Sequence, residues 1–311
     1  MGWIDKLFGQ DRPSDRTQAP ANEPSPNEPG AKEPAPPANG ESYTLDELFA
    51  PHEAYFAQLA LPCVDIEMTA VPEEAHSALE PDGMEARASK LGGVPFSPAG
   101  YEWPTDPNGN RLHLLAQVNF AEAPPLSGPN IPKGFPTDGI LQVFEHDFGV
   151  DSDYEFGEVK YFTAEEARAP HVPYAGDAPL FDPVDAAVSR PCRMSFAPSV
   201  SEGGAGDADF QNALTAVGLG ALTGYEDDTY DEARDELYDR FSASGHRIGG
   251  YAGFTQEDFR VNQEYPDVHV LQIDSDEHVM FGDCGVAHVF IPADALAAGD
   301  WSKAHYYWDC S

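Results

Sequence analysis

Two segments of the chain end in the same arrangement of polar side chains, and they are the first candidates for chemistry. One contains Gln117 and Asn119 after Leu-Leu-Ala, and the other contains Gln272 and Asp274 after His-Val-Leu. Side chains alternate between the two faces of a strand, so each Gln shares a face with the Asn or Asp that follows. A buried amide needs hydrogen-bond partners. The pairs therefore either line a cleft or hold neighbouring backbone.

Carboxylates gather near the second segment, at Asp274, Asp276 and Asp283. Oxygen ligands of this kind suit a divalent cation such as Ca²⁺. Paired carboxylates such as Asp274 and Asp283 can also act as general acid and base in a hydrolase. In so acidic a chain, clusters of this kind also arise by chance.

Other catalytic patterns are missing from the sequence. It contains no Gly-x-Ser-x-Gly nucleophile motif, no His-Glu-x-x-His zinc motif and no Gly-rich phosphate loop. Lys90 precedes Gly92 and Gly93, where an ammonium group could bind phosphate, although a salt bridge is the simpler role. No cofactor is expected, and a divalent cation is the alternative.

The elements that must position these residues are mainly strands. Alternating or apolar runs predict strands over 63–71, 112–120, 140–145, 158–162, 268–273 and 286–291. A capping box of Thr44 and Glu47 predicts a helix near residue 44, and a second helix is expected over 229–241. Strands and helices do not alternate regularly. The pattern indicates an α+β fold with mostly antiparallel or mixed sheets and a few flanking helices.

The strand segments also repeat in order. A Gly-Gly pair, a strand with Gln, and a Gly-led apolar strand occur within residues 85–162 and again within residues 242–311. We interpret these half-repeats as an internal duplication within one domain that spans residues 43–311. Two similar halves commonly pack about a pseudo-twofold axis, which would create a groove between them.

Composition excludes some classes of function. The 311 residues include 54 acids and 17 bases, for a formal net charge of −37. A nucleic-acid partner is not expected, because such proteins need a basic surface. No apolar run reaches the ~18 residues of a membrane-spanning helix. A basic protein partner would complement the charge.

The first 42 residues differ from the rest of the chain. Residues 1–10 carry apolar side chains at helical spacing, and the following segment to residue 42 contains eight prolines without apolar periodicity. We expect a disordered, extended linker that carries a short terminal peptide. That peptide is either a frayed end or a weak peripheral docking element for a partner or a membrane surface.

Several spaced motifs resemble one known family. They are Ser89-Lys90-Leu91-Gly92-Gly93, Trp103-Pro104, Gln117-Val118-Asn119, Gln272-Ile273-Asp274 and Trp308-Asp309-Cys310. Over residues 44–311 the chain resembles the YwqG-like family, a bacterial domain of unknown function. The resemblance implies an α+β domain and a cytoplasmic setting, with no established activity and no assigned catalytic residues.

These observations favour a non-enzymatic cytoplasmic binding or protein-interaction protein. Its groove would lie between the two halves, and the alternative is the hydrolase with Asp274 and Asp283, with or without a divalent metal. The expected groove residues are Lys90, Trp103, Gln117, Asn119, Gln272, Asp274, Asp283 and Trp308. The expected ligands for a metal are Asp274, Asp276 and Asp283.

Overall fold

The computed structural model describes most of the chain after residue 41. The described residues are 34, 42–77, 80–109, 111–145, 157–173, 187–225, 227–262 and 267–310. The predicted terminal peptide at residues 1–10 and nearly all of the linker lie outside this set. None of the helices in the described part has the length and apolar character that a membrane crossing requires.

The strands form the main body of the structure. Within the described residues, ten strands form one antiparallel sheet in the order β10-β9-β8-β7-β1-β6-β2-β3-β4-β5. Their bounds are β1 Leu61–Ala70, β2 Lys90–Leu91, β3 His113–Asn119, β4 Ile140–Glu145, β5 Gly157–Phe162, β6 Cys192–Ser201, β7 Arg247–Gly249, β8 Asp267–Asp274, β9 Val286–Pro292 and β10 His305–Asp309. The predicted α+β class is confirmed.

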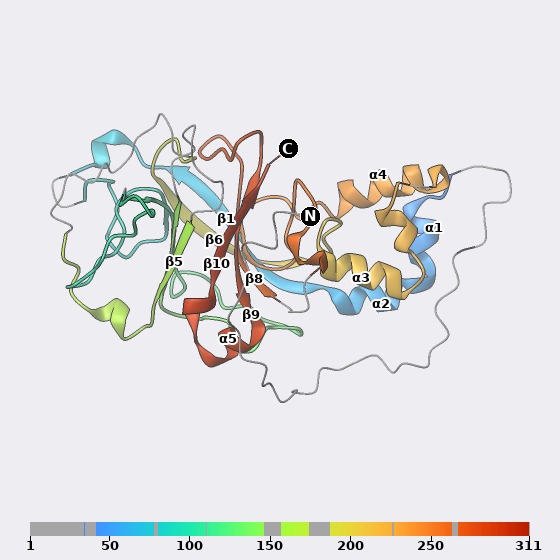
Figure 1. Ribbon diagram of the computed structural model, residues 1–311, viewed down its shortest axis with the longest axis horizontal. Coiled ribbons are helices and arrows are strands. Elements are labelled where there is room, and N and C mark those ends of the chain that lie inside the picture. Colours follow the sequence, from blue (N-terminus) through green and yellow to red (C-terminus); the bar gives the residue numbers. More distant parts are fainter. Residues whose placement is uncertain are drawn as a thin grey trace.

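The sheet curls until its two end strands, β5 and β10, approach each other (Figure 1). At this seam the Tyr306 hydroxyl donates a hydrogen bond to the Glu145 carboxylate, 3.2 Å away. Gly157 lies so close to the Tyr306 side chain that a Cβ atom there would overlap it. The sheet is therefore nearly closed, and its inner face holds the main apolar core, including Val118, Leu141 and Val289.

The strand order of the sheet is symmetric. If each of β1–β5 is exchanged with the corresponding strand of β6–β10 and the sheet is read from its other end, the same order results. The central strands β1 and β6 pair along their full length, from Leu61 opposite Ser201 to Ala70 opposite Cys192. Each half's second strand pairs with the other half's first, β2 with β6 and β7 with β1. The topological unit is therefore larger than the predicted half-repeats, because β1 and β6 also correspond.

Helices form a separate lobe beside the strands, on the right in Figure 1. They are α1 Leu45–Phe49, α2 Glu53–Leu59, α3 Ala208–Ala216 and α4 Asp231–Arg240, while α5 Ala293–Ala298 lies beside the sheet. Phe210, Leu237 and Phe49 belong to the apolar core of this lobe. Helices α1 and α2 precede β1, whereas α3 and α4 lie between β6 and β7, so the lobe combines helices from both halves of the chain.

Helix caps explain where these helices begin. The capping box of Thr44 and Glu47 is present at α1, as predicted. The predicted helix over 229–241 begins later, at Asp231. Thr229 lies in a preceding 3₁₀ turn, which the Asp227 side chain caps. The side chain of Arg240 reaches Asp46 on α1, 3.3 Å away. The long polar side chains of α4 thus join two helices.

Candidate functional site

The predicted amide of the first half lies inside the protein. The Gln117 side chain is fully buried. Its Oε1 accepts a hydrogen bond from the Phe96 backbone N–H at 2.7 Å. Its Nε2 donates to the carbonyls of Ala86 and Ala88, at 2.9 and 2.8 Å. Gln117 therefore fastens the chain on both sides of the Gly-Gly turn to strand β3.

The second half repeats these contacts. The Gln272 side chain is also fully buried. Its Oε1 accepts from the Gly253 backbone N–H at 2.8 Å, and its Nε2 donates to the carbonyls of Ala243 and Gly245, both at 2.8 Å. The two amides were expected either to line a cleft or to hold neighbouring backbone. Their contacts are with backbone groups, so both side chains act as backbone clamps and neither faces a groove.

The local backbone repeats as well. Both Gly-Gly turns have positive φ angles, 62° and 80° at Gly92 and Gly93, and 67° and 74° at Gly249 and Gly250. Such values favour glycine over residues with a Cβ atom. The β3–β4 and β8–β9 pairs each contain a register shift centred two residues before the clamp Gln, at Leu115 and at Val270. In each half, a Gly-Gly turn, a register shift and a buried Gln side chain therefore occur together along the same strand.

The residues that follow the clamps bind backbone too. The Asn119 Nδ2 donates to the Arg87 carbonyl at 3.1 Å, and the Asp274 Oδ2 accepts from the Gly245 N–H at 2.6 Å. Both side chains are half-buried. They extend the clamp in each half and do not face one another across a groove.

Lys90 is a buried structural cation. Its Nζ lies 2.9 Å from Asp82 Oδ2 and donates to the Val94 carbonyl at 3.1 Å. Burial lowers the pKa of Lys90, and the Asp82 carboxylate opposes this shift. The side chain is 0% exposed, so a phosphate in solvent cannot reach it. The salt bridge is the role that the contacts support.

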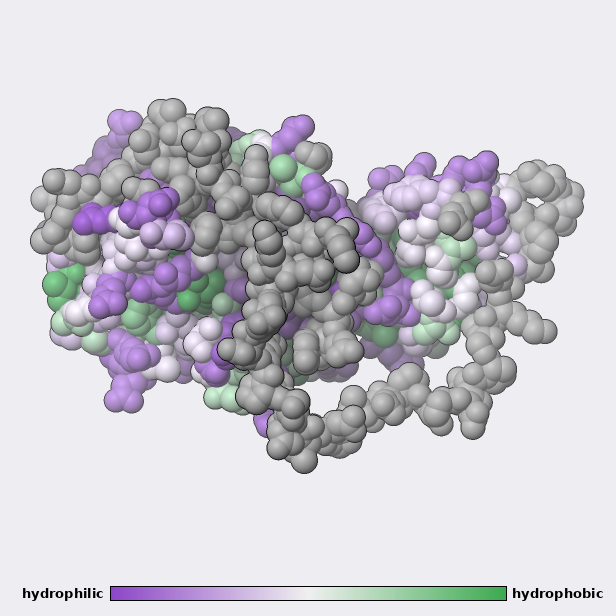
Figure 2. Space-filling model, in the orientation of Figure 1, coloured by the Kyte–Doolittle hydropathy of each residue, from purple (hydrophilic) through white to green (hydrophobic). Residues whose placement is uncertain are grey.

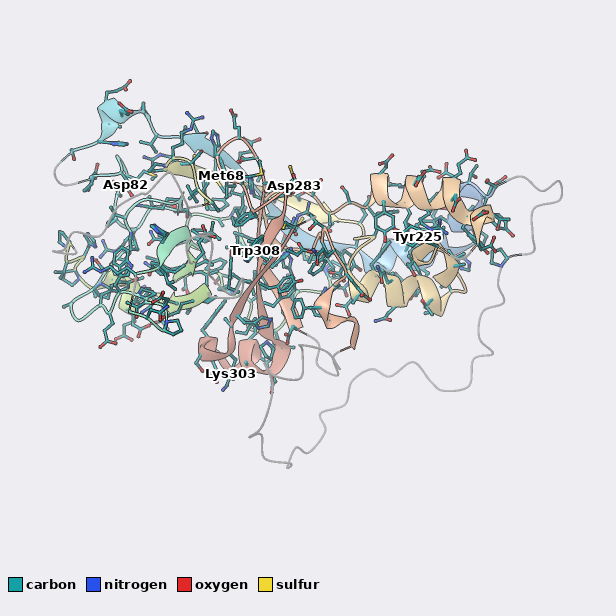
Figure 3. All side chains as sticks on the ribbon, turned by 45° about the horizontal axis from the view of Figure 1, so that its top comes forward. Met68, Asp82, Tyr225, Asp283, Lys303 and Trp308 are labelled. Atoms are coloured by element: carbon teal, nitrogen blue, oxygen red, sulfur yellow. The ribbon has the colours of Figure 1, made fainter. Side chains whose placement is uncertain are left out.

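The three acids of the predicted metal site are not brought together. Among the described residues, no group of three His, Cys, Asp or Glu side chains could hold a metal ion. The Asp276 carboxylate instead accepts from the backbone N–H groups of His278 and Val279, which closes the turn after β8. Asp283 is exposed (Figure 3). Asp274 is held by the clamp described above.

The two predicted aromatic residues also lie apart. The Trp103 Nε1 donates to the Leu112 carbonyl at 2.9 Å, and its ring packs against Phe144 on the outer face of the sheet. Trp308 lies on β10 and contacts Phe281 at the main core. Figure 3 shows Trp308 near the middle of the molecule, separated from Asp82. The predicted set therefore does not form a single groove.

A different cleft joins the two halves. It has a volume of about 450 Å³ and opens to solvent. Its walls come from residues 98–102 before β3, residues 159–162 of β5, and Trp301 and Ser302 in the 3₁₀ helix η8 (Trp301–Lys303). The first two segments belong to the first half and the third belongs to the second half, so the cleft lies at the seam.

Aromatic rings dominate both sides of this cleft. On one side Tyr101 stacks near Phe162, with ring centroids 6.2 Å apart. On the other side Trp301 stacks on Tyr161, with centroids 4.3 Å apart and an interplanar angle of 13°. Stacked rings present flat apolar surfaces that hold their position without a ligand.

Hydrogen bonds to the protein hold the hydroxyl groups of the two tyrosines in place. The Tyr101 hydroxyl donates to Gln142 Oε1 at 3.0 Å, and the Tyr161 hydroxyl donates to the Asp138 carbonyl at 2.8 Å. Burial, with the nearby Asp138 and Glu166 carboxylates, raises the pKa of Tyr161 to about 12. Both phenols therefore stay neutral at physiological pH. Trp301 has no hydrogen bond from its indole N–H to any described residue, which leaves a donor at the wall.

Strand β5 forms the floor of the cleft. Among the described strands it forms ladder hydrogen bonds only with β4, and its other edge faces β10 and η8 across the seam. Lys160 projects from this strand, with its Nζ 3.3 Å from Glu158 and 5.1 Å from the Tyr101 ring centroid. The cleft thus combines an edge strand, aromatic walls and a neutralised lysine, an arrangement suited to holding an extended chain.

No motif in the sequence marks these residues as a site. Alternation predicts the strand over 158–162, but Tyr101, Lys160, Tyr161 and Trp301 were not among the predicted site residues. The available signal was the alternation of that strand, which places Tyr161 on one face and Lys160 on the other. Strand β5 ends the sheet and meets η8 only because the whole sheet is nearly closed. No local sequence pattern specifies that closure.

Comparison with known proteins identifies the family. The family model of DUF1963, a domain of unknown function, matches residues 89–310. This match begins later than the YwqG-like resemblance, which started near residue 44. No curated protein matches the chain. Because the match covers more than half of the sequence, the chain belongs to the DUF1963 family of domains of unknown function.

Proposed function

We propose that this protein is a binding protein, and that it captures an extended, proline-containing, basic peptide segment in the cleft between its two halves. The observation that carries the proposal is the pair of aromatic walls, Tyr101 with Phe162 and Trp301 with Tyr161, on either side of β5. We also propose that the two halves arose by duplication of one unit.

Proline favours this kind of site for a physical reason. A proline-rich segment is already extended in the polyproline II conformation, so it loses little conformational entropy on binding. Its rings pack between flat aromatic side chains, and its carbonyls accept hydrogen bonds from a donor such as the Trp301 indole. Pro98 and Gly100 supply a small, apolar rim at one end of the cleft.

Charge favours a basic segment. The chain carries a net charge of −37. Near the cleft, Glu102 is exposed, the Glu158 side chain is 45% exposed, and Asp300 is exposed beside Trp301. Lys160 is already paired with Glu158. A cationic peptide therefore gains long-range attraction that salt weakens.

The size of the cleft sets the expected strength. A volume of about 450 Å³ is in the range of small-ligand pockets, ~300–1,000 Å³. It accommodates a few residues of a peptide, so we expect weak and reversible binding. Such a cleft would suit transient recognition of a peptide segment more than a permanent complex.

The test is a calorimetric titration of the full chain with a synthetic basic proline-rich peptide, beside a peptide in which alanine replaces each proline. We expect heat of binding with the first peptide and a much weaker signal with the second. Trp301→Ala should weaken binding tenfold or more, because an aromatic anchor contributes ~2 kcal/mol or more.

The matched control is Lys303→Ala, which changes an exposed residue of the same 3₁₀ helix (Figure 3) that does not line the cleft. It should retain the affinity of the natural chain. Equal binding of both peptides, or no effect of Trp301→Ala on binding, would contradict the proposed function.

A further inference from the structure

Lys160 occupies a place in the cleft whose surroundings attract a cation. Its Nζ lies 5.1 Å from the centroid of the Tyr101 ring, donates a hydrogen bond to the Glu102 carbonyl at 2.8 Å and lies 3.3 Å from the Glu158 carboxylate. An aromatic face, a carbonyl and a carboxylate each stabilise a positive charge. Tyr101, Glu102 and Lys160 line the cleft. The Tyr101 ring, the Glu102 carbonyl and the Glu158 carboxylate therefore form a cation subsite at its wall.

The Tyr101 ring is held in its position by groups other than Lys160. The Tyr101 hydroxyl donates to Gln142 Oε1 at 3.0 Å, and Gln142 Nε2 donates to Gln117 Oε1 at 2.9 Å. Gln117 and Gln142 are fully buried, and Gln142 lies directly opposite Lys160 in the β4–β5 pair. The sheet therefore fixes the aromatic face of the subsite, and we expect that face to stay in place when Lys160 moves away.

The contacts that hold the Lys160 ammonium lie at the protein surface. The Lys160 side chain is 22% exposed and that of Glu158 is 45% exposed. An ion pair at this level of exposure is weak, because water screens the charges and two long side chains lose freedom. The flexible lysine side chain can turn outward, and water then hydrates its ammonium. A cation of the bound segment can therefore displace Lys160 from the subsite.

We infer that the cation subsite receives an arginine side chain of the bound segment, and that Lys160 is the specificity-determining residue which this arginine displaces. This inference rests on the proposed function. A lysine of the segment would only replace one ammonium with another, at no net gain. A guanidinium pairs with a carboxylate through two parallel hydrogen bonds, stacks on an aromatic ring and is more weakly hydrated than an ammonium. Lys160 thus cancels the gain of a ligand lysine and leaves a gain for arginine.

The experiment measures the fluorescence anisotropy of labelled synthetic proline-rich peptides titrated with full-length protein, in about 0.15 M salt to screen long-range attraction. Three peptides are identical except at one position, which holds arginine, lysine or citrulline, the uncharged analogue of arginine. No other position carries a base. With the natural chain we expect the arginine peptide to bind ~5-fold more tightly than the lysine peptide. The lysine and citrulline peptides should bind about equally.

The variant Lys160→Met removes the competing ammonium and keeps most of the apolar part of the side chain. It should tighten binding of both the arginine and the lysine peptide by ~5-fold, because each cation then enters an empty subsite. Binding of the citrulline peptide should stay unchanged. The matched control is Lys303→Met, which removes the same charge from an exposed residue that does not line the cleft. It should reproduce the affinities of the natural chain.

The outcomes separate this inference from the proposed function. Equal binding of the arginine and lysine peptides by the natural chain overturns the inference, as does an unchanged affinity of both for Lys160→Met. Equal tightening of these peptides by Lys303→Met also overturns it, because the cause would then be the net charge. In each of these cases the proposed function stands if the peptides bind in a Trp301-dependent manner. If no proline-rich peptide binds, the proposed function fails and the inference fails with it.

Discussion

Replacement of Gln272 by Leu removes the clamp of the second half with little change in side-chain size. It deletes three hydrogen bonds, one from the Gly253 N–H and two to the carbonyls of Ala243 and Gly245. Each contributes about 1 kcal/mol net, and a buried partner left unpaired costs about 1–3 kcal/mol. We therefore expect Gln272→Leu to lower the free energy of unfolding by about 3–5 kcal/mol.

The equivalent substitution Gln117→Leu should cost at least as much. Gln117 makes the same three contacts and also accepts a hydrogen bond from the Gln142 side chain at 2.9 Å. The assay is urea unfolding followed by circular dichroism, with comparison of the extrapolated free energies. The control is Gln58→Leu on α2, whose side chain makes one exposed hydrogen bond to the Ala54 carbonyl. It should change the free energy by less than about 0.5 kcal/mol.

A cost below about 1 kcal/mol for either clamp would refute this reasoning. A large loss of unfolding free energy for one of the two substitutions, with no loss for the other, would also refute it. Either result would mean that the two amides, despite their matching contacts, do not hold equivalent parts of the fold.

Three further predictions concern charge. Asp82→Asn leaves the buried Lys90 ammonium without its counter-charge. Urea unfolding should show that the free energy of unfolding falls by about 3–5 kcal/mol. An unchanged unfolding midpoint would contradict a structural salt bridge as the role of Lys90. Burial lowers the pKa of His269 to about 3, below its ordinary ~6.5, so its contribution to stability is complete above pH 6.5 and declines as the pH falls. At pH 5 this amounts to about 2 kcal/mol. Burial also lowers the pKa of the neighbouring His288, so His269→Gln should reduce the difference between unfolding curves at pH 7 and 5 without abolishing it, and an unchanged difference would contradict the prediction. Added salt screens the −37 net charge, so the melting temperature should rise with salt, and a flat profile would argue against net self-repulsion.

The long strands were predictable because they are apolar or alternating over five or more residues. The predicted 140–145 strand coincides with β4, and 286–291 differs from β9 by one residue. In contrast, β2 and β7 have only two and three residues, too few to show a period. Strand β6 was missed although Cys192, Met194 and Phe196 alternate with polar residues, because Pro198 interrupts the pattern and argues against a central strand.

The candidate site was harder to predict. Strand alternation correctly placed Gln117 and Asn119, and Gln272 and Asp274, at equivalent positions of two strands. It could not show that the chain around each Gly-Gly turn folds over that face, where the segment before the turn accepts hydrogen bonds from the Gln side chain and the segment after it donates one. The outcome depends on contacts between residues 19–31 positions apart in the sequence. Nor could it bring Trp301 to Tyr161, 140 positions away, because that contact exists only once the sheet is nearly closed.

Surface chemistry agrees with a recognition role in one respect. In Figure 2 the described surface is mostly purple or pale, with small green patches. The net charge of −37 would attract the cationic segment that we propose as the partner. The aromatic cleft therefore adds local apolar contact to a general electrostatic attraction.

The most direct test of the cleft is photo-crosslinking of a basic proline-rich peptide that carries a photoreactive aromatic residue, followed by mass spectrometry of the full-length protein. We expect crosslinks to concentrate at residues 98–102 and at Trp301 and Ser302, and an excess of unlabelled peptide to prevent them. Competable labels concentrated instead around Asp274 and Asp283, or on the helical lobe, would contradict it.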